Sequence, residues 1–596
     1  MMRALLVYPT HENCNEVAHD AARHGLDVAV YPGRITKGDA PNCWNLDADD
    51  AERMGFPVVK TVCPTCPHRR KCGEVGYLAK IIIAQQATVA VCTHGRAEHS
   101  GFRELCANRQ FVSIHENAIA LLRPRCECTA ADLLLIQTLF RRLLNDPKSL
   151  DWFGDDLKVD DEGVPYHDQE VAVRRERLYD FCLHMAEIVD DLQVRLDEAE
   201  QLTEWVVPPV RSRPPGIERL LFGMCRFLGL PFRGGAWRFV LAASAGELTS
   251  AAILVATQHA SDKRKAQSHL TVAGKSLIGF RYNPPSFACT TWFNDATVTA
   301  DVLTSVLNHS VQNKTPPGRI ELQKKAVQVL RDITRQTLPQ SVAGIIRGVL
   351  TDRPQFTRVG IITHRPHIKS ILSLEPEFRQ RIVKTSYFGS GDERSSNAWH
   401  RECDFIVVAG TPRLRPDAIR DYLIQIGRVG AAARGAEWGP IRWIGQTESG
   451  ERVTVATGGY LDAEWRQAYL DLVRASLVQA IGRGRGILAD GCEVLVLSNE
   501  ECGIPISDSE VTPLNLTELS VLSELKRATA VSPINTYIAK TAVSTETIAS
   551  AIGLSVRRTR VILSSLDERG LVVRVGERGG WLPFNNGGSD VTYGDA

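Results

Sequence analysis

Four cysteines near the start of the chain have the spacing and the neighbours of metal ligands. They are Cys43, Cys63, Cys66 and Cys72, a single thiol followed by a C-x2-C-x5-C run. Four soft thiolates suit a [4Fe–4S] cluster or a structural zinc ion. Cysteines of an apolar core normally stand in apolar runs, as Cys92 does, whereas proline, histidine, arginine and lysine surround the C-x2-C-x5-C run. The pattern therefore predicts a metal site within residues 43–72 rather than scattered core thiols.

The candidate metal site lies inside an alternation of strands and helices. Strand-like apolar runs precede and follow it, at residues 3–10, 87–94 and 111–117. Residues 130–144 and 171–206 then carry apolar side chains at helical spacing, and a strand-rich stretch that includes Trp237–Leu241 follows. A second alternation extends over residues 318–510. This order predicts an α/β fold with two parallel-sheet domains.

The composition is that of a large globular protein without a strong overall charge. The chain has 596 residues, 44% of them apolar, and a formal net charge of +1. Roughly three to five domains are expected at this length, and any nucleic-acid contact must come from local basic patches. Fifteen cysteines, odd in number and clustered, indicate a reducing compartment. No apolar run suits a signal peptide or a membrane helix, so we expect a cytoplasmic protein with no membrane partner.

Five further segments stand where strands are expected to end. In chain order they are Leu5–Asn13, Ser113–Ala118, Phe293–Thr297, Tyr387–Arg413 and Gln479–Ile487. Together with the cysteines, their order resembles the superfamily-2 DNA helicases, and most strongly the iron–sulphur branch related to the excision-repair helicases. The resemblance implies two RecA-like domains around one ATP, and it favours a [4Fe–4S] cluster over zinc.

The resemblance also assigns roles to polar residues of these segments. The implied catalytic residues are Glu116, Gln479, Arg483 and Arg485, the cofactor-binding residues are Asp295, Arg394 and Asn397, and the DNA-contacting residue is Thr10. In the family, the glutamate polarises the attacking water, and the arginines stabilise charge on the γ-phosphate. From the residues alone, Glu116 is equally a solvated strand end, and Asp295 is equally a helix cap.

Two features depart from the family pattern. His115 stands where the family has the aspartate that orders Mg²⁺, and an imidazole supplies no anionic oxygen. No G-x-x-x-x-G-K-[ST] loop occurs in the chain, and only four residues precede the strand at Leu5. A miscalled start, a split or truncated gene, and a degenerate non-hydrolysing relative are the competing explanations. His115 favours the last, because a wrong start would not change it.

The C-terminal part resembles a winged helix-turn-helix. Residues 545–554 predict a helix, residues 556–569 a recognition helix and residues 571–582 a hairpin. The recognition helix carries three arginines for DNA phosphates or base edges, Arg557, Arg558 and Arg560. A packing or dimerisation module would have the same pattern, and that alternative stays open.

The resemblance divides the chain into six parts. They are a partial RecA-like domain 1 with the cysteine cluster (1–127), a helical insertion (128–235), the remainder of RecA-like domain 1 (236–317), RecA-like domain 2 (318–510), a winged-helix DNA-binding domain (515–584) and a disordered tail (585–596). This organisation predicts a DNA helicase-like protein of replication, repair or mobile-element maintenance. Its expected partner is duplex or single-stranded DNA, with ATP and Mg²⁺ only if an upstream phosphate-binding loop exists. The alternatives are a catalytically degenerate DNA-binding or regulatory protein and a zinc-stabilised binding module.

Overall fold

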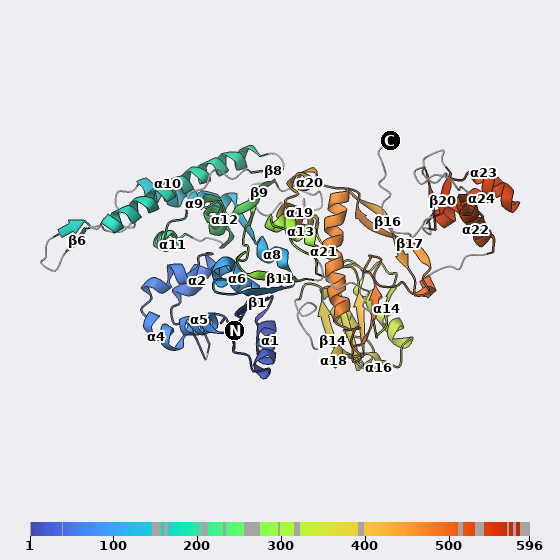
Figure 1. The fold of residues 1–596 in the computed structure, drawn as a ribbon, viewed down its shortest axis with the longest axis horizontal. Coiled ribbons are helices and arrows are strands. Elements are labelled where there is room, and N and C mark those ends of the chain that lie inside the picture. Colours follow the sequence, from blue (N-terminus) through green and yellow to red (C-terminus); the bar gives the residue numbers. More distant parts are fainter. Residues whose placement is uncertain are drawn as a thin grey trace. The chain divides into compact units, whose positions relative to one another are not determined.

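The structure is a computed structural model in which the chain forms two compact units (Figure 1). Unit 1 contains Met1–Pro316 and Arg415–Gly435, and unit 2 contains Pro317–Leu414 and Ala436–Ala596. The described residues are 2–38, 40–145, 157–159, 165–167, 169–199, 202–205, 212–230, 234–255, 275–295, 298–314, 322–390, 399–510, 516–530, 542–568, 571–575 and 580–583. Within these ranges no helix has the length and the apolar content of a membrane span. The tail predicted to be disordered, residues 585–596, lies outside them.

A five-stranded parallel sheet forms the N-terminal part of unit 1. Its order is β11-β4-β1-β3-β2, with β1 (Ala4–Tyr8), β2 (Val28–Val30), β3 (Val89–Thr93), β4 (Phe111–His115) and β11 (Thr290–Asn294). The inner strands are apolar, and most of their residues are buried, as is usual for parallel strands covered on both faces. Because all five strands are parallel, their carboxyl ends meet at one edge, which we call the carboxyl edge.

Short helices connect these strands. They are α1 (His11–Arg23) after β1, α6 (His94–Ser100) and α7 (Phe102–Leu105) after β3, α8 (Ala118–Leu122) after β4 and α13 (Ala300–Leu307) after β11. Between β2 and β3 the chain forms the cysteine module, residues 43–86. It contains α2 (Asp47–Arg53), α3 (Val58–Thr61), a 3-10 turn (Cys63–Thr65), α4 (Arg69–Val75) and α5 (Tyr77–Gln86). The buried guanidinium of Arg109 fixes the end of α5 to the sheet, since it donates to the carbonyls of Ala84 (3.0 Å) and Ala4 (3.2 Å).

The rest of unit 1 combines a four-stranded antiparallel sheet with a helical layer. The sheet has the order β5-β10-β9-β8, from β5 (Arg125–Thr129), β8 (Thr203–Glu204), β9 (Leu248–Val255) and β10 (Lys275–Arg281). The helices are α9 (Ala130–Asn145), α10 (Gln169–Glu198), α11 (Ile217–Phe227) and α12 (Gly234–Ser244), and a small hairpin of β6 (Leu157–Val159) and β7 (Pro165–His167) precedes α10.

The predicted strand at Trp237–Leu241 is wrong, because these residues lie in α12. Trp237, Phe239 and Val240 are fully buried in the core of this part of unit 1. A helix that is buried on nearly every side has little amphipathic period, so its sequence does not distinguish it from a buried strand.

Two helices of unit 1 come from the middle of the unit 2 sequence. They are α19 (Pro416–Gln425) and α20 (Val429–Arg434). A reciprocal pair of hydrogen bonds holds α19, in which Arg123 Nη1 donates to Gln425 O (2.7 Å) and Gln425 Nε2 donates to Arg123 O (2.8 Å). Arg125 and Asp421 form an ion pair at 2.9 Å beside them. The chain therefore leaves unit 2 after residue 414 and returns to it at residue 436.

Unit 2 contains the second five-stranded parallel sheet, in the order β12-β18-β15-β13-β14. Its strands are β12 (Ala326–Val329), β13 (Val359–Thr363), β14 (Ile382–Tyr387), β15 (Phe405–Ala409) and β18 (Glu493–Leu497). Its helices are α14 (Pro339–Thr351), α15 (Arg365–Ile371), α16 (Pro376–Arg379), α18 (Trp399–Glu402) and α21 (Ala463–Gly482). Two parallel sheets with helical connections are consistent with two RecA-like domains.

A hairpin, a short turn and a C-terminal group of helices and strands complete unit 2. A long antiparallel hairpin consists of β16 (Trp438–Gln446) and β17 (Arg452–Tyr460), and the short 3-10 turn Asp508–Glu510 follows the second sheet. Residues 516–583 contain α22 (Leu516–Ala530), α23 (Thr545–Ile552), α24 (Val556–Glu568), β19 (Val572–Arg574) and β20 (Trp581–Pro583). These last elements share their own apolar core, which includes Val521, Leu525, Ile548, Leu563 and Trp581.

Candidate functional site

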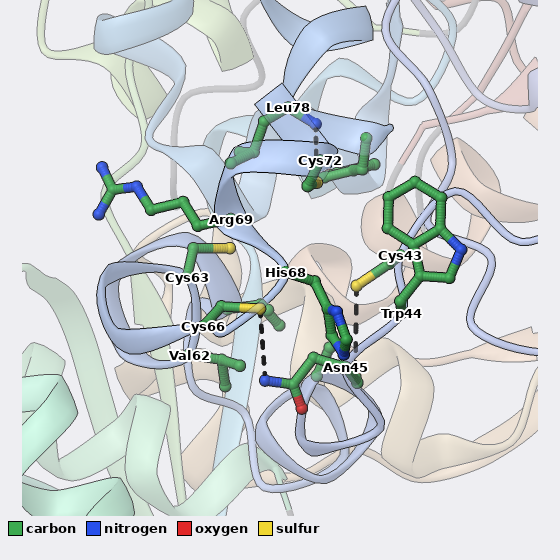
Figure 2. Close-up of a pocket in the computed structure, with 13 residues that line it drawn as sticks. Cys43, Trp44, Asn45, Val62, Cys63, Cys66, His68, Arg69, Cys72 and Leu78 are labelled. Carbon is green, nitrogen blue, oxygen red and sulfur yellow. Dashed lines mark hydrogen bonds between the residues drawn. The ribbon is translucent and has the colours of Figure 1, made fainter. Parts of the chain in front are cut away.

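The four predicted metal ligands line one pocket in the cysteine module. Figure 2 shows the side chains of Cys43, Cys63, Cys66 and Cys72 around a common space, with Asn45, His68 and Leu78 beside them. Proline at the second position of the 3-10 turn tightens the chain between Cys63 and Cys66, while α4 presents Cys72. The structure therefore brings together cysteines that are separated by up to 29 positions in the sequence, from Cys43 to Cys72.

Hydrogen bonds to sulfur are a second feature of this pocket. The backbone N–H of Leu78 donates to Cys72 Sγ (3.4 Å), and Asn45 Nδ2 donates to Cys66 Sγ (3.6 Å). Burial raises the pKa of the Cys63 thiol to about 11. N–H donors of this kind stabilise thiolates and tune iron–sulphur clusters, so the two hydrogen bonds suit thiolate forms of Cys72 and Cys66. Among the described residues, no three histidine, cysteine or carboxylate side chains meet the distance required to share one metal ion.

A larger cleft lies between the cysteine module and the carboxyl edge of the first sheet. Its volume is about 450 Å³. One wall comes from residues 32–34 and 93–96, which follow β2 and β3, and the other comes from residues 56–60 and from α5. Four cationic side chains face two carboxylates in the lining, namely Arg34, Lys60, Arg96 and Arg238 against Glu52 and Glu104. The cleft is therefore a local basic patch on a nearly neutral protein.

Tyr77 organises the two innermost arginines of the cleft. The Arg34 guanidinium lies 4.6 Å from the centre of the Tyr77 ring, and Arg96 Nη1 donates to Tyr77 Oη at 2.7 Å. Thr93 caps α6 by accepting from Arg96 N (3.2 Å), which fixes the first turn that carries Arg96. A guanidinium group is only weakly hydrated, so little free energy is lost to desolvation when it stacks on an aromatic ring. Both guanidinium groups are thereby held at the cleft.

The guanidinium groups of Arg34 and Arg96 are only partly paired. The Nε atoms of Arg34 and Arg96 are buried and have no hydrogen-bond partner in the part of the chain that the structure describes. Arg34 pairs with Glu52 at 3.1 Å through Nη1, and Lys60 pairs with Glu104 at 3.9 Å. The lining has more cationic than anionic side chains, which favours an anionic ligand with acceptor oxygens.

The predicted DNA contact Thr10 lies at the carboxyl edge as a helix cap. Its Oγ1 accepts from Asn13 N (3.2 Å) at the start of α1. His115 ends β4 and stacks on Tyr8, with ring centres 4.1 Å apart, and its Nε2 lies 2.9 Å from Ser113 Oγ. Burial, together with the nearby His94, lowers the pKa of His115 to about 4. His115 is therefore a neutral imidazole at pH 7.

Glu116 and Asp295 meet the same edge of the first sheet. Glu116 and Asn117 have φ angles of 56° and 49°, so the chain turns from β4 into α8 through two left-handed residues. Such a conformation is unusual for glutamate and marks a constrained position. Asp295 Oδ2 accepts from Ala118 N at 3.1 Å, so it contacts the first residue of α8, whereas Thr299 caps α13, the helix that follows Asp295 in the chain. The structure thus places Thr10, His115, Glu116 and Asp295 along one sheet edge.

The other predicted nucleotide residues belong to unit 2. Gln479 lies on α21, which ends at Gly482 as its glycines predict. Arg483 is buried, whereas Arg485 is exposed and has a φ of 46° between two glycines. Arg394 and Asn397 fall within 391–398 and lie outside the described residues.

The three arginines of the C-terminal part lie on the exposed face of α24. Ser555 Oγ accepts from Arg558 N (3.3 Å) and so begins this helix. Arg557, Arg558 and Arg560 are all exposed, and Arg560 lies 3.8 Å from Glu546 in a solvent-exposed ion pair. Such a pair contributes little stability, so these arginines are available to an external anion.

Sequence reasoning missed Arg34, Arg96 and Tyr77. No motif joins them, because they come from three separate segments that the cleft brings together. The one available signal was the position of Arg96 just after the strand predicted at residues 87–94, because the strand before Arg34, β2, was not predicted. Ligands of open parallel sheets commonly bind at the carboxyl ends of strands.

Comparison with known proteins gives no family for this chain. No family model matches it, and no curated protein matches its sequence. A solved structure titled "Truncated XPD" is 10% identical over 52% of this chain and 86% of its own, with a TM-score of 0.23. The Hef helicase domain of Pyrococcus furiosus is 11% identical over 72% of this chain and 90% of its own, with a TM-score of 0.12. Both similarities are too weak to define a shared fold.

Proposed function

We propose that the protein binds single-stranded DNA on a helicase-like scaffold, in the cleft beside the cysteine module. The observation that carries this proposal is the pair Arg34 and Arg96, which Tyr77 holds in the lining of a basic cleft. Single-strand sites combine a basic groove with aromatic side chains. A sugar–phosphate backbone supplies anionic oxygens for the cationic side chains that line the cleft.

The cysteine module would form a metal-stabilised wall of that cleft. The four thiols would hold a [4Fe–4S] cluster, as the family resemblance implies, or zinc as the alternative. When bound, the metal would cross-link the 3-10 turn, α4 and the segment at Cys43, and so fix the neighbouring helix α5. Since α5 carries Tyr77, the metal would support the arginines indirectly.

Nucleotide hydrolysis is the less supported part of a helicase function. Neutral His115 replaces an anionic Mg²⁺ ligand, and the chain contains no G-x-x-x-x-G-K-[ST] loop. We therefore propose a DNA-binding protein that hydrolyses ATP slowly or not at all. ATP-driven unwinding, with Glu116, Gln479, Arg483 and Arg485 in the family roles, remains the second candidate.

The C-terminal part would add a duplex-DNA contact. Helices α23 and α24 with the hairpin β19–β20 have the element order of a winged helix, and α24 would be its recognition helix. The exposed Arg557, Arg558 and Arg560 would then contact phosphates or base edges. The alternative, a dimerisation or packing module, predicts no change in DNA affinity when they are removed.

Binding of fluorescein-labelled oligodeoxythymidine, followed by fluorescence anisotropy, tests the proposal. Replacing Arg34→Gln and Arg96→Gln together should weaken binding by at least about tenfold, because two charge-assisted hydrogen bonds are removed. The slope of log K against log salt should also flatten by about 0.7 for each phosphate that is no longer neutralised. The matched control is Arg23→Gln, a 72% exposed arginine at the far end of α1, which should change neither value. Unchanged binding by the double variant at every salt concentration would exclude the cleft as the DNA site.

A further inference from the structure

Two cysteines outside the candidate metal site lie together near the start of strands β4 and β11. Cys106 directly follows α7, and Cys289 directly precedes β11. The Cys289 thiol donates to the carbonyl oxygen of Ser286 at 2.8 Å. The Cys106 thiol interacts with the same carbonyl group and with the Cys289 side chain. Both thiols therefore share one small space beside the first sheet.

Hydrogen bonds hold together the two backbone segments that carry these cysteines. Phe102 N, at the start of α7, donates to Asn283 Oδ1 at 3.2 Å, and Asn283 is buried. On the other side of the thiols, Thr290 N donates to Gln110 O at 2.9 Å. A disulfide needs two backbones at a fixed and short separation, and these bonds supply that condition.

The two thiols differ in their access to solvent. Cys289 is partly exposed in a turn whose residues Phe287 and Ala288 are exposed. Cys106 is only 2% exposed, and burial raises the pKa of its thiol to about 12. An attacking thiol must be reachable by its oxidant. Cys289 is therefore the cysteine that an oxidant meets first, and Cys106 is placed to react with it afterwards.

A second pair of thiols, in unit 2, shows why this access matters. Cys403 and Cys492 interact electrostatically with each other, but both are buried. Neither of them offers a thiol that a dissolved oxidant reaches. Proximity is thus common to the two pairs, and the partly exposed Cys289 distinguishes the pair in unit 1.

We propose that Cys106 and Cys289 form a reversible disulfide with glutathione disulfide as the oxidant, and that this disulfide pins edge strand β11 to the first sheet. The Cys289 thiolate attacks one sulfur of glutathione disulfide, forms a mixed disulfide and releases one glutathione thiolate. The Cys106 sulfur then attacks Cys289 Sγ and displaces the second glutathione. The two protons of the protein thiols end on the two released glutathione molecules, so two thiols are oxidised while one disulfide is reduced.

The disulfide would join the two sides of a long excursion of the chain. Cys106 and Cys289 are separated by 183 positions, which include the antiparallel sheet and the helical layer of unit 1. Within the described ranges, β11 pairs with β4 alone. A cross-link that closes a loop of this length strongly restricts the unfolded chain. It would therefore hold β11 in place when the rest of the excursion opens.

Pinning of β11 would also hold polar groups at the carboxyl edge. Asn294 Nδ2 donates to Ser113 Oγ at 2.6 Å, and Asp295 Oδ2 accepts from Ala118 N. Both contacts depend on the position of β11 and lie beside His115. Disulfides in reducing compartments are usually transient and redox-sensing. The pair therefore makes the rigidity of this edge responsive to the state of the glutathione pool.

Peptide mapping of the full chain tests the pair. The protein is purified without oxygen, equilibrated with glutathione at several ratios of its reduced and oxidised forms, alkylated and digested. Oxidised glutathione should yield a cross-linked peptide of Cys106 and Cys289 that dithiothreitol removes, while Cys403 is recovered as a thiol. Cys289→Ser should leave Cys106 a thiol at every ratio. The matched control is Cys14→Ala, which removes a fully buried thiol from α1 and should retain the cross-link.

Hydrogen exchange at single-amide resolution tests the pinning. The amides of Thr290 and Glu116 bond β11 to its neighbours, and they should exchange at least about tenfold more slowly in the oxidised parent than in the reduced parent. Cys289→Ser should exchange at the reduced rate under both conditions. No cross-link at any ratio, a mixed disulfide that persists at Cys289, or equal exchange in the two states would overturn the proposal. These measurements use no DNA, so their outcome is independent of the proposed function.

Discussion

The second sheet buries every residue of its strands β13 and β15, whereas the first sheet leaves alternate residues of β11 exposed. Both sheets have five parallel strands. At the carboxyl ends of the second sheet, Thr363 Oγ1 donates to Ala409 O and Thr411 Oγ1 meets Ser498 Oγ, both at 2.8 Å. In the described part of the chain, His364 Nε2 and Glu500 Oε2 at these ends are buried without a hydrogen-bond partner. The first sheet adjoins a cleft lined by four cationic side chains and two carboxylates.

The difference shows that a five-stranded parallel sheet serves mainly stability in unit 2 and mainly binding in unit 1. A sheet whose inner strands are fully buried contributes stability and positions its neighbours. The first sheet has an edge strand with exposed residues, a neutral histidine beside a constrained turn and a neighbouring cleft with an excess of cationic side chains. We therefore attribute binding mainly to the first sheet, and the predictions below test that division.

The largest expected effect is on the cysteine module beside the first sheet. Cys72→Ala should abolish iron binding, and with it the absorbance near about 400 nm of thiolate-bound iron–sulphur protein. The parent, purified without oxygen, should be brown. Elemental analysis for iron and zinc decides between the two metals. Cys92→Ala, which removes a fully buried thiol from β3, is the matched control and should retain the metal. A parent with neither metal would refute the site.

The next effect contrasts the interiors of the two sheets. Ile361→Ala in β13 should lower the free energy of unfolding of unit 2 by about 2–5 kcal/mol, because a fully buried side chain leaves a cavity. Trp292→Ala in β11 should cost less, since half of that side chain is already in water. Urea denaturation of both variants measures the difference. A larger loss for Trp292→Ala would mean that the edge of the first sheet is covered.

A moderate effect is expected for duplex DNA at the C-terminal part. Arg557→Ala with Arg560→Ala should weaken binding and lower the salt slope of log K by about 0.9 for each phosphate that an arginine no longer neutralises. The control is Arg527→Ala on α22, whose exposed guanidinium pairs with Glu524. Equal binding by the double variant and the parent, at every salt concentration, would make this part a packing or dimerisation module.

The smallest expected effect is on ATP hydrolysis. His115→Asp should leave DNA-stimulated turnover below about 1 s⁻¹, under the usual range of enzymes, because an Mg²⁺ ligand is of little use without a phosphate-binding loop. Turnover of the parent is expected to be equally slow, as released phosphate would show. Rapid hydrolysis by the parent would contradict our interpretation of His115 and restore the ATP-driven alternative.

Periodic features of the sequence predicted local structure well. The helix expected at residues 130–144 is α9, and the glycines after residue 481 end α21. The spacing of the cysteines anticipated their shared pocket. The strand prediction for Trp237–Leu241 was wrong, because a helix that is buried on nearly every side has little amphipathic period. The cleft and the transfer of α19 to unit 1 depend on contacts between distant segments, which no local pattern records.

Photo-cross-linking of single-stranded DNA that contains 5-bromodeoxyuridine tests the central claim most directly. We expect adducts in the full chain at the cleft, in residues 32–34, 56–60, 77–85 and 93–96. These adducts should disappear when Arg34→Gln and Arg96→Gln are combined, while Arg23→Gln should keep them. Adducts confined to the second parallel sheet, or adducts in unit 1 that the double variant leaves unchanged, would contradict the assignment of DNA binding to the cleft beside the first sheet.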